Sequence, residues 1–152
     1  WNLSGIYSIR GGEPVNVYSG TDYALTNSPN QRPAVLHNWI LPGSRHRLNK
    51  LALTGNTWFD PTAFGAPASG TFSTLGRNAI IGPSRITNNM SAARMFAIPG
   101  REGMTFQFRC DAFGVFNTPN LGTPANKVGS SLGQITSTSG ERFLQLSGKL
   151  TF

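Results

Sequence analysis

The sequence predicts an all-β fold, an antiparallel meander of about four membrane-crossing strands that forms an unclosed segment of a larger outer-membrane barrel. Three observations lead to this prediction. Several segments alternate apolar and polar residues with the two-residue period of a strand. Charged residues make up only 12% and hydrophobic residues 38% of the chain, which suits strands with one apolar face. The connections between these segments differ greatly in length, as they do in outer-membrane barrels.

Four strands are predicted from the alternation, near residues 1–10, 88–98, 105–116 and 142–152. Each segment has roughly the 9–11 residues that a tilted strand needs to cross a bilayer. No segment keeps the apolar spacing of a helix over three turns without a glycine or proline. We therefore expect strands and no membrane-spanning helix.

Alternation also divides the predicted strands into two faces. The residues predicted to face lipid are Phe106, Phe108, Leu144 and Leu146, and those predicted to face the lumen are Gln107, Arg109 and Asp111. Arg94 falls on the apolar face of its strand. We expect it near a headgroup boundary, where its long side chain can reach polar surroundings.

The unequal connections give the strands a direction. A short turn at 99–103 joins the second and third strands and is predicted to be periplasmic. Segments 11–87 and 117–141 are long and rich in Gly, Pro, Asn, Ser and Thr, and we predict that both are extracellular loops. The fourth strand then runs inward, so that the C-terminus lies on the periplasmic side.

No catalytic, cofactor-binding or metal site is predicted, and the protein is expected not to be an enzyme. Residues 129–133 match the G-x-S-x-G pattern, but that motif needs a helix after it, and the following residues are not helical. His37 and His46 lack the helical or cysteine partners of a metal site. Cys110 is the one cysteine, so it cannot form an internal disulfide.

The net charge of +7 is spread along the chain. Its densest group consists of Arg45, His46, Arg47 and Lys50, and no aromatic residues interleave with it to build a stacking platform for bases. We therefore expect a solvated basic loop and no nucleic-acid partner. The alternative that stays open is a soluble basic all-β module that binds nucleic acid or glycan.

The chain begins in strand-like alternation and shows neither the basic start nor the apolar run of a signal peptide. This start leads us to expect that the chain is the C-terminal fragment of a longer protein.

Short stretches along nearly the whole chain resemble one family, the Oar-like TonB-dependent receptors. They are WNLSGI (1–6), GEPV (12–15), WFDPTAF (58–64), GRN (76–78), GP (82–83), FR (108–109), AF (112–113), FN (116–117), PN (119–120), GQI (133–135) and RFLQ (142–145). Their order and spacing carry the resemblance, because no single stretch is specific.

The resemblance implies a barrel of about 22 strands with a plugged lumen. Such a receptor lies in the outer membrane of a Gram-negative bacterium and takes up a large nutrient with energy delivered by TonB. It often carries an N-terminal carboxypeptidase-regulatory-like domain. The implied partners are outer-membrane lipid, the barrel-assembly machinery, the rest of the barrel with its plug, and TonB, which a part upstream of residue 1 would contact.

The last residues are similar to the β-signal that the barrel-assembly machinery reads. In this resemblance Gln145, Leu150 and Phe152 hold the polar, hydrophobic and terminal aromatic positions. Physically, a last strand must present an unpaired edge before it closes against the first strand of its barrel.

Overall fold

The computed structural model describes residues 1–41, 57–100 and 103–152. The chain forms two compact units, which we call the sheet unit (Trp1–Arg10, Arg85–Asn120 and Thr138–Phe152) and the loop unit (Gly11–Ser84 and Leu121–Ser137). Its elements are β1 (Asn2–Arg10), β2 (Pro14–Val15), β3 (Ala34–Val35), the 3-10 helix η1 (Pro61–Ala63), β4 (Phe64–Gly65), β5 (Ile80–Ile81), β6 (Arg85–Ala97), β7 (Thr105–Phe113), β8 (Asn120–Leu121), β9 (Thr138–Ser139) and β10 (Phe143–Thr151).

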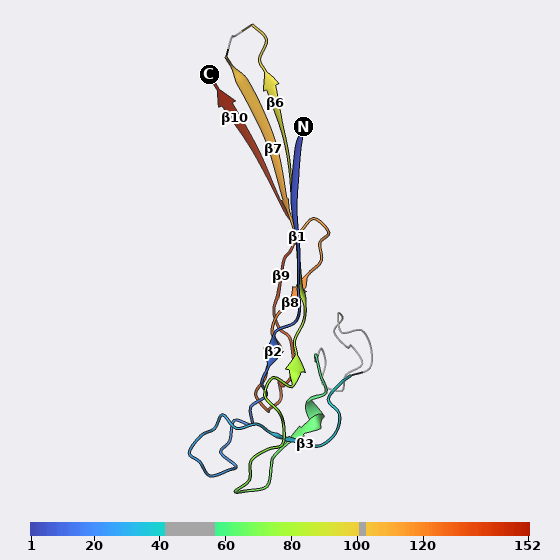
Figure 1. Ribbon diagram of the computed structural model, residues 1–152, viewed down its shortest axis with the longest axis vertical. Coiled ribbons are helices and arrows are strands. Elements are labelled where there is room, and N and C mark those ends of the chain that lie inside the picture. The colour runs from blue at the N-terminus through green and yellow to red at the C-terminus, as the bar shows by residue number, and fades with distance from the viewer. Residues whose placement is uncertain (42–56, 101–102) are drawn as a thin grey trace. The chain divides into compact units, whose positions relative to one another are not determined.

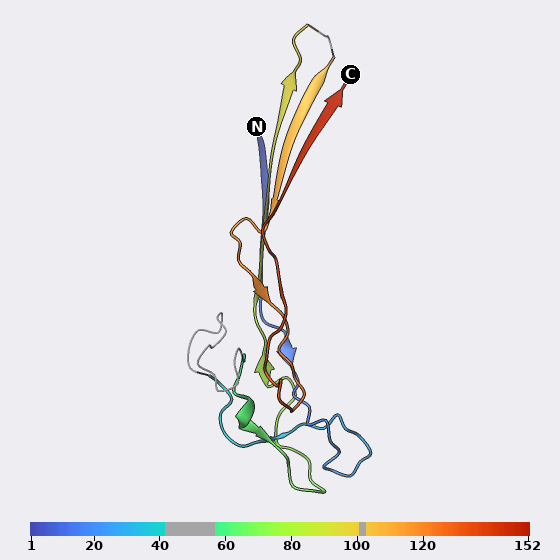
Figure 2. The ribbon, with the colours of Figure 1, turned by 180° about the vertical axis from the view of Figure 1, so that it is seen from behind.

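The sheet unit is a four-stranded antiparallel sheet in the order β1-β6-β7-β10. Figures 1 and 2 show these long strands running beside one another, with both chain ends at the same end of the sheet as the β6–β7 turn. The predicted all-β antiparallel meander is thus confirmed. Within the described residues, the outer edges of β1 and β10 pair with no further strand of this sheet, so that it is unclosed.

Two strand boundaries differ from the prediction by three residues, and the others agree within one residue. β6 begins at Arg85, three residues before the predicted segment, because Arg85 and Ile86 still pair with the end of β1. The side chain of Asn120 supports this extension, since it accepts from the Ile86 amide at 2.7 Å and donates to the Ile86 carbonyl at 2.9 Å.

The predicted strand 105–116 is wrong in its last three residues, because β7 ends at Phe113. Gly114 leaves the strand with φ 58°, in the left-handed region. Asparagines of β6 then bind the departing chain: the side-chain oxygen of Asn89 accepts from the Gly114 amide at 3.2 Å, and that of Asn88 accepts from the Phe116 amide at 2.9 Å. Alternation continues through Phe116 in the sequence, but the backbone turns first.

We expect Gly114→Ala to lower the free energy of unfolding by about 2–3 kcal/mol. A Cβ at this position would lie 2.9 Å from the carbonyl oxygens of Gly140 and Glu141, in addition to the cost of the positive φ. Urea unfolding of the full-length protein in detergent measures the loss. Gly70→Ala is the control, because Gly70 also has a positive φ but its Cβ would meet no atom within 4 Å. Equal losses in the two variants would contradict the predicted clash.

The loop unit has a packed core, although its sequence was predicted to form loops alone. The buried apolar side chains of this core are Val15, Val17, Phe59, Ala63, Phe64, Leu75, Ile80 and Leu132. Phe59 and Phe64 meet edge to face with ring centroids 5.6 Å apart. The short ladders β2–β5 and β3–β4 connect distant parts of this segment. Leu132, from the G-x-S-x-G stretch, is part of the core.

The turn predicted at 99–103 lies between β6 and β7, as expected from its proline and two glycines. The Ile98 amide donates to the Met104 carbonyl at 3.1 Å, and Gly100 and Gly103 have positive φ values. Residues 101–102 of this turn lie outside the described part.

The basic group of Arg45, His46, Arg47 and Lys50 also lies outside the described residues. Among the residues that the structure does describe, no helix is long and apolar enough to cross a membrane.

Candidate functional site: the two faces of the sheet

The register of the sheet sorts its side chains onto two faces. Residues that pair across an antiparallel ladder share a face, and successive residues of one strand alternate between faces. The row across the middle of the sheet is Leu3, Ala92, Cys110 and Leu146. The same register places Phe106, Phe108, Leu144 and Leu146 on this face and Gln107, Arg109 and Asp111 on the opposite one. Which face meets lipid remains a prediction.

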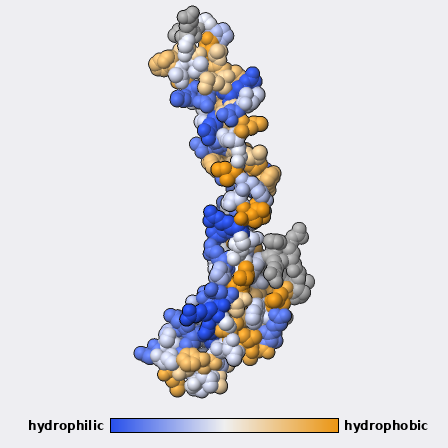
Figure 3. All heavy atoms as spheres, viewed as in Figure 1, coloured by the Kyte–Doolittle hydropathy of each residue, from blue (hydrophilic) through white to orange (hydrophobic). Residues whose placement is uncertain are grey.

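The first face, which we call the apolar face, is uncovered within the described residues. Leu3 and Leu146 keep 76% and 67% of their surface exposed, and several further apolar side chains are similarly open. Figure 3 shows orange apolar side chains on the surface of the four-stranded sheet. A contiguous bare apolar surface is unfavourable in water and marks contact with lipid or another apolar surface.

The opposite face, which we call the polar face, carries an ordered ion pair. The Arg109 guanidinium donates to both carboxylate oxygens of Asp111 at 2.9–3.0 Å. Asp111 is in register with Ser91 and Gln145 on the neighbouring strands. This bidentate geometry holds the two side chains against each other. A charged pair on this face suits contact with a water-filled lumen.

The polar face also carries some apolar side chains. They are Ile6, Met95, Phe113 and Phe143. Phe113 and Phe143 stack with ring centroids 6.0 Å apart at the end of the sheet where β7 stops. The alternation is therefore strictest along the middle of β7 and β10.

Arg94 is the cation of the apolar face. It lies three residues before the end of β6, and its guanidinium carbon sits 5.3 Å from the centre of the Trp1 ring and 4.9 Å from that of Phe96. Cation–π contacts of this kind offset part of the cost of a charge in apolar surroundings. Arg94 lies close to the β6–β7 turn, and its placement at a headgroup boundary remains a prediction.

The predicted β-signal residues lie in and after the last strand. Gln145 is on the polar face of β10, Leu150 is on the apolar face, and Phe152 follows the strand with 94% of its surface exposed. Their role in assembly remains a prediction.

The family comparison adds to this geometry. The model of the outer membrane beta barrel domain matches residues 1–145. The chain belongs to this family. An outer membrane beta barrel domain lies in the outer membrane of Gram-negative bacteria, where its strands form the barrel wall. Searches of curated proteins and of solved structures gave no match.

Family membership explains why the sheet has an exposed apolar face and two unpaired edges. In a closed barrel, lipid surrounds the outer face of the sheet, and the edges of β1 and β10 have further strands to pair with. The match therefore favours the barrel over the soluble basic binding module.

His37 contacts Asp60 in the loop unit. Its Nε2 is 3.2 Å from the Asp60 carboxylate, which also caps η1 by accepting from the amide and hydroxyl of Thr62 at 2.9 and 2.7 Å. Burial raises the pKa of Asp60, but the hydrogen bonds from Thr62 and His37 outweigh it and hold the pKa below its usual value. The arrangement is that of a helix cap.

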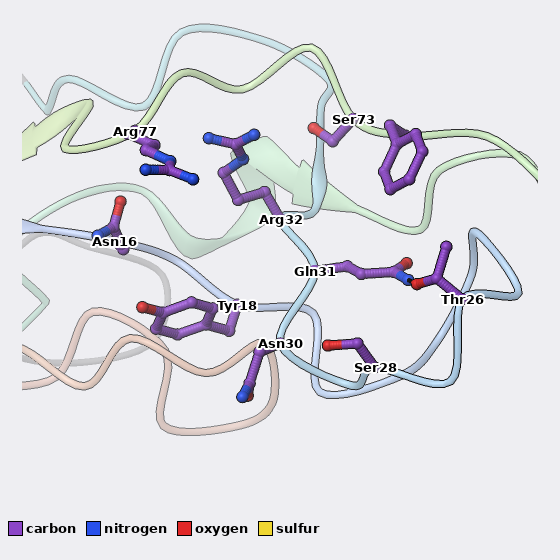
Figure 4. A pocket seen from close by; sticks show the side chains of 10 residues that line it. Asn16, Tyr18, Thr26, Ser28, Asn30, Gln31, Arg32, Ser73 and Arg77 are labelled. Atoms are coloured by element: carbon purple, nitrogen blue, oxygen red, sulfur yellow. Dashed lines mark hydrogen bonds between the residues drawn. The ribbon is translucent and has the colours of Figure 1, made fainter.

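Sequence reasoning missed a pocket in the loop unit, with a volume of about 480 Å³ and mostly polar residues in its lining. Its lining residues are Asn16, Tyr18, Thr26, Ser28, Asn30, Gln31, Arg32, Phe72, Ser73 and Arg77, all but Phe72 labelled in Figure 4. They come from three separate stretches without a common motif. The sequence does show an excess of basic over acidic residues. This excess does not indicate which basic side chains line a common pocket.

Proposed function

We propose that this barrel domain is the wall and extracellular loop region of a TonB-dependent transporter that takes up a large nutrient. The observation that carries the proposal is the placement of the connections along the sheet. Arg10 pairs with Arg85, so that the long connection between β1 and β6 leaves at one end, while the 98–104 turn closes the other. Long loops outside and short turns in the periplasm are typical of such barrels.

The second support comes from the short stretches that resemble the Oar-like receptors. In such a receptor the lumen is filled by a plug, and the plug and the TonB-contacting segment would lie outside residues 1–152. The ordered Arg109–Asp111 pair would then face the plug or lumen water, and Phe106, Phe108, Leu144 and Leu146 would face lipid. TonB would bind the segment outside residues 1–152 and would not contact the strands of the sheet unit.

Planar-bilayer recording on the full-length protein tests this function. A plugged transporter is expected to show no steady conductance on insertion, because the lumen is closed until TonB acts. A purified periplasmic domain of TonB should bind the same protein, and deletion of the segment before the plug should remove this binding. A persistent open channel, or no TonB binding, would contradict the proposal and indicate a porin-like barrel.

A further inference from the structure

The pocket of the loop unit collects positive charge without a matching carboxylate. Arg32 and Arg77 both line it, and none of the ten lining residues is acidic. Figure 4 shows the Arg32 guanidinium pointing toward that of Arg77. Among the residues that the structure describes, neither guanidinium has a hydrogen-bond or ion-pair partner. Two like charges on the wall of one pocket repel each other, and an anion between them relieves that repulsion.

Guanidinium groups also define what kind of anion fits. Each presents a planar fork of N–H donors that matches the oxygens of a carboxylate or a phosphate. Beside them, Asn16 accepts from the Asn78 amide at 2.7 Å through its side-chain oxygen, which leaves its NH₂ group as a donor. The pocket thus offers donors from two arginines and an amide.

The wall opposite the arginines is built before any ligand arrives. The Gln31 side chain donates to Thr26 at 2.8 Å and to the Asp22 carboxylate, and it accepts from the Ala24 amide at 2.8 Å. Gln31 therefore holds the 22–31 loop in place and is not free for a ligand.

Asp22 anchors the same loop by accepting from the Thr26 and Asn27 amides at 3.1 and 2.5 Å. Burial raises the pKa of Asp22, but these hydrogen bonds and that of Gln31 outweigh it and keep the pKa below its usual value. Asp22 consequently stays ionised while its oxygens are occupied by the loop. A fixed wall lowers the entropy cost of binding.

The remaining lining is aromatic and hydroxylated. Phe72 and Tyr18 supply ring faces, and Ser28 and Asn30 supply small polar groups. The Ser73 hydroxyl already donates to the Pro33 carbonyl and accepts from the Leu75 amide at 3.0 Å. Rings combined with small hydrogen-bonding groups suit a ligand that has both C–H faces and hydroxyls. A bare inorganic anion would use only the arginine side of this pocket.

We propose that this pocket binds an anionic sugar, whose carboxylate or phosphate lies between Arg32 and Arg77 and whose ring meets Tyr18 and Phe72. The proposal rests on the proposed transport function in one respect: the sugar would be the nutrient or a part of it. Binding itself does not depend on transport, so that the two can fail separately.

Isothermal titration calorimetry on the full-length protein in detergent, without TonB, tests the proposal with three probes: glucuronate, glucose 1-phosphate and glucose. At least one of the two anions should bind at least about tenfold more tightly than glucose, since the charge-assisted bonds are absent with the neutral sugar. A preference between the two anions identifies the charged group. Equal binding of all three, or no binding of either anion below about 10 mM, would overturn the proposal.

Two variants and a control locate the site. Arg32→Gln and Arg77→Gln should each weaken binding of the preferred anion about tenfold. Arg142→Gln is the control, because Arg142 is exposed and lies in the sheet unit, outside this lining. Unchanged affinity in both pocket variants would overturn the site. If a variant folds poorly, the comparison of charged and neutral sugars on the unaltered protein still tests the proposal.

Discussion

Phe59→Ala is expected to destabilise the loop unit by about 3–5 kcal/mol. Phe59 is only 2% exposed, and its ring meets Phe64 edge to face within the core. The backbone of Gly133 also packs against it, since a Cβ there would lie 3.3 Å from the Phe59 ring. Truncation removes these contacts and leaves a cavity that rigid neighbours cannot fill. A domain is stable by only about 5–15 kcal/mol, so that a loss of this size removes a large part of its stability.

Limited proteolysis of the full-length protein in detergent measures this effect. In the Phe59→Ala variant we expect rapid cleavage within 11–84, while β6, β7 and β10 stay protected in the barrel. Phe72→Ala is the matched control, because the same side chain is removed from a position that is 73% exposed. If both variants resisted protease equally, the core of the loop unit would not be a stabilising structure.

The long strands were predictable because their signal is local. The side chains of Phe106, Gln107 and Phe108 alternate between faces in any strand, whatever the rest of the chain does. The end of β7 was not predictable in this way. Alternation continues to Phe116, and only Gly114, whose backbone turns against Gly140 and Glu141, shows where the strand stops.

The loop unit could not be predicted from its sequence. Its core joins Val15, Phe59, Ile80 and Leu132, which are distant in the chain and follow neither the strand nor the helix period. Their contacts are fixed by how the chain folds back on itself, and a local pattern carries no such information. The pocket has the same origin, because Arg32 and Arg77 come to line the same pocket only after this folding.

The second large effect is expected for Leu146→Arg, which should lower the free energy of unfolding from a bilayer by about 2–4 kcal/mol. Leu146 pairs with Cys110 near the middle of β7, so that on the apolar face it would lie close to the bilayer midplane. Leu150 pairs with Phe106, closer to the β6–β7 turn. Leu150→Arg should therefore cost only about 0–1 kcal/mol, since the penalty falls toward the interface.

The control for Leu146→Arg is Gln145→Arg, one residue away on the polar face. Its register partner is Asp111, which already pairs with Arg109, so that the new guanidinium lies beside this carboxylate on the polar face. Reversible urea unfolding from lipid vesicles is the suitable measurement, because refolding without the assembly machinery separates stability from any effect on a β-signal. A loss at position 145 as large as that at 146 would mean that the two faces have been assigned wrongly. A loss at 150 as large as that at 146 would mean that the sheet does not cross the bilayer in the expected direction.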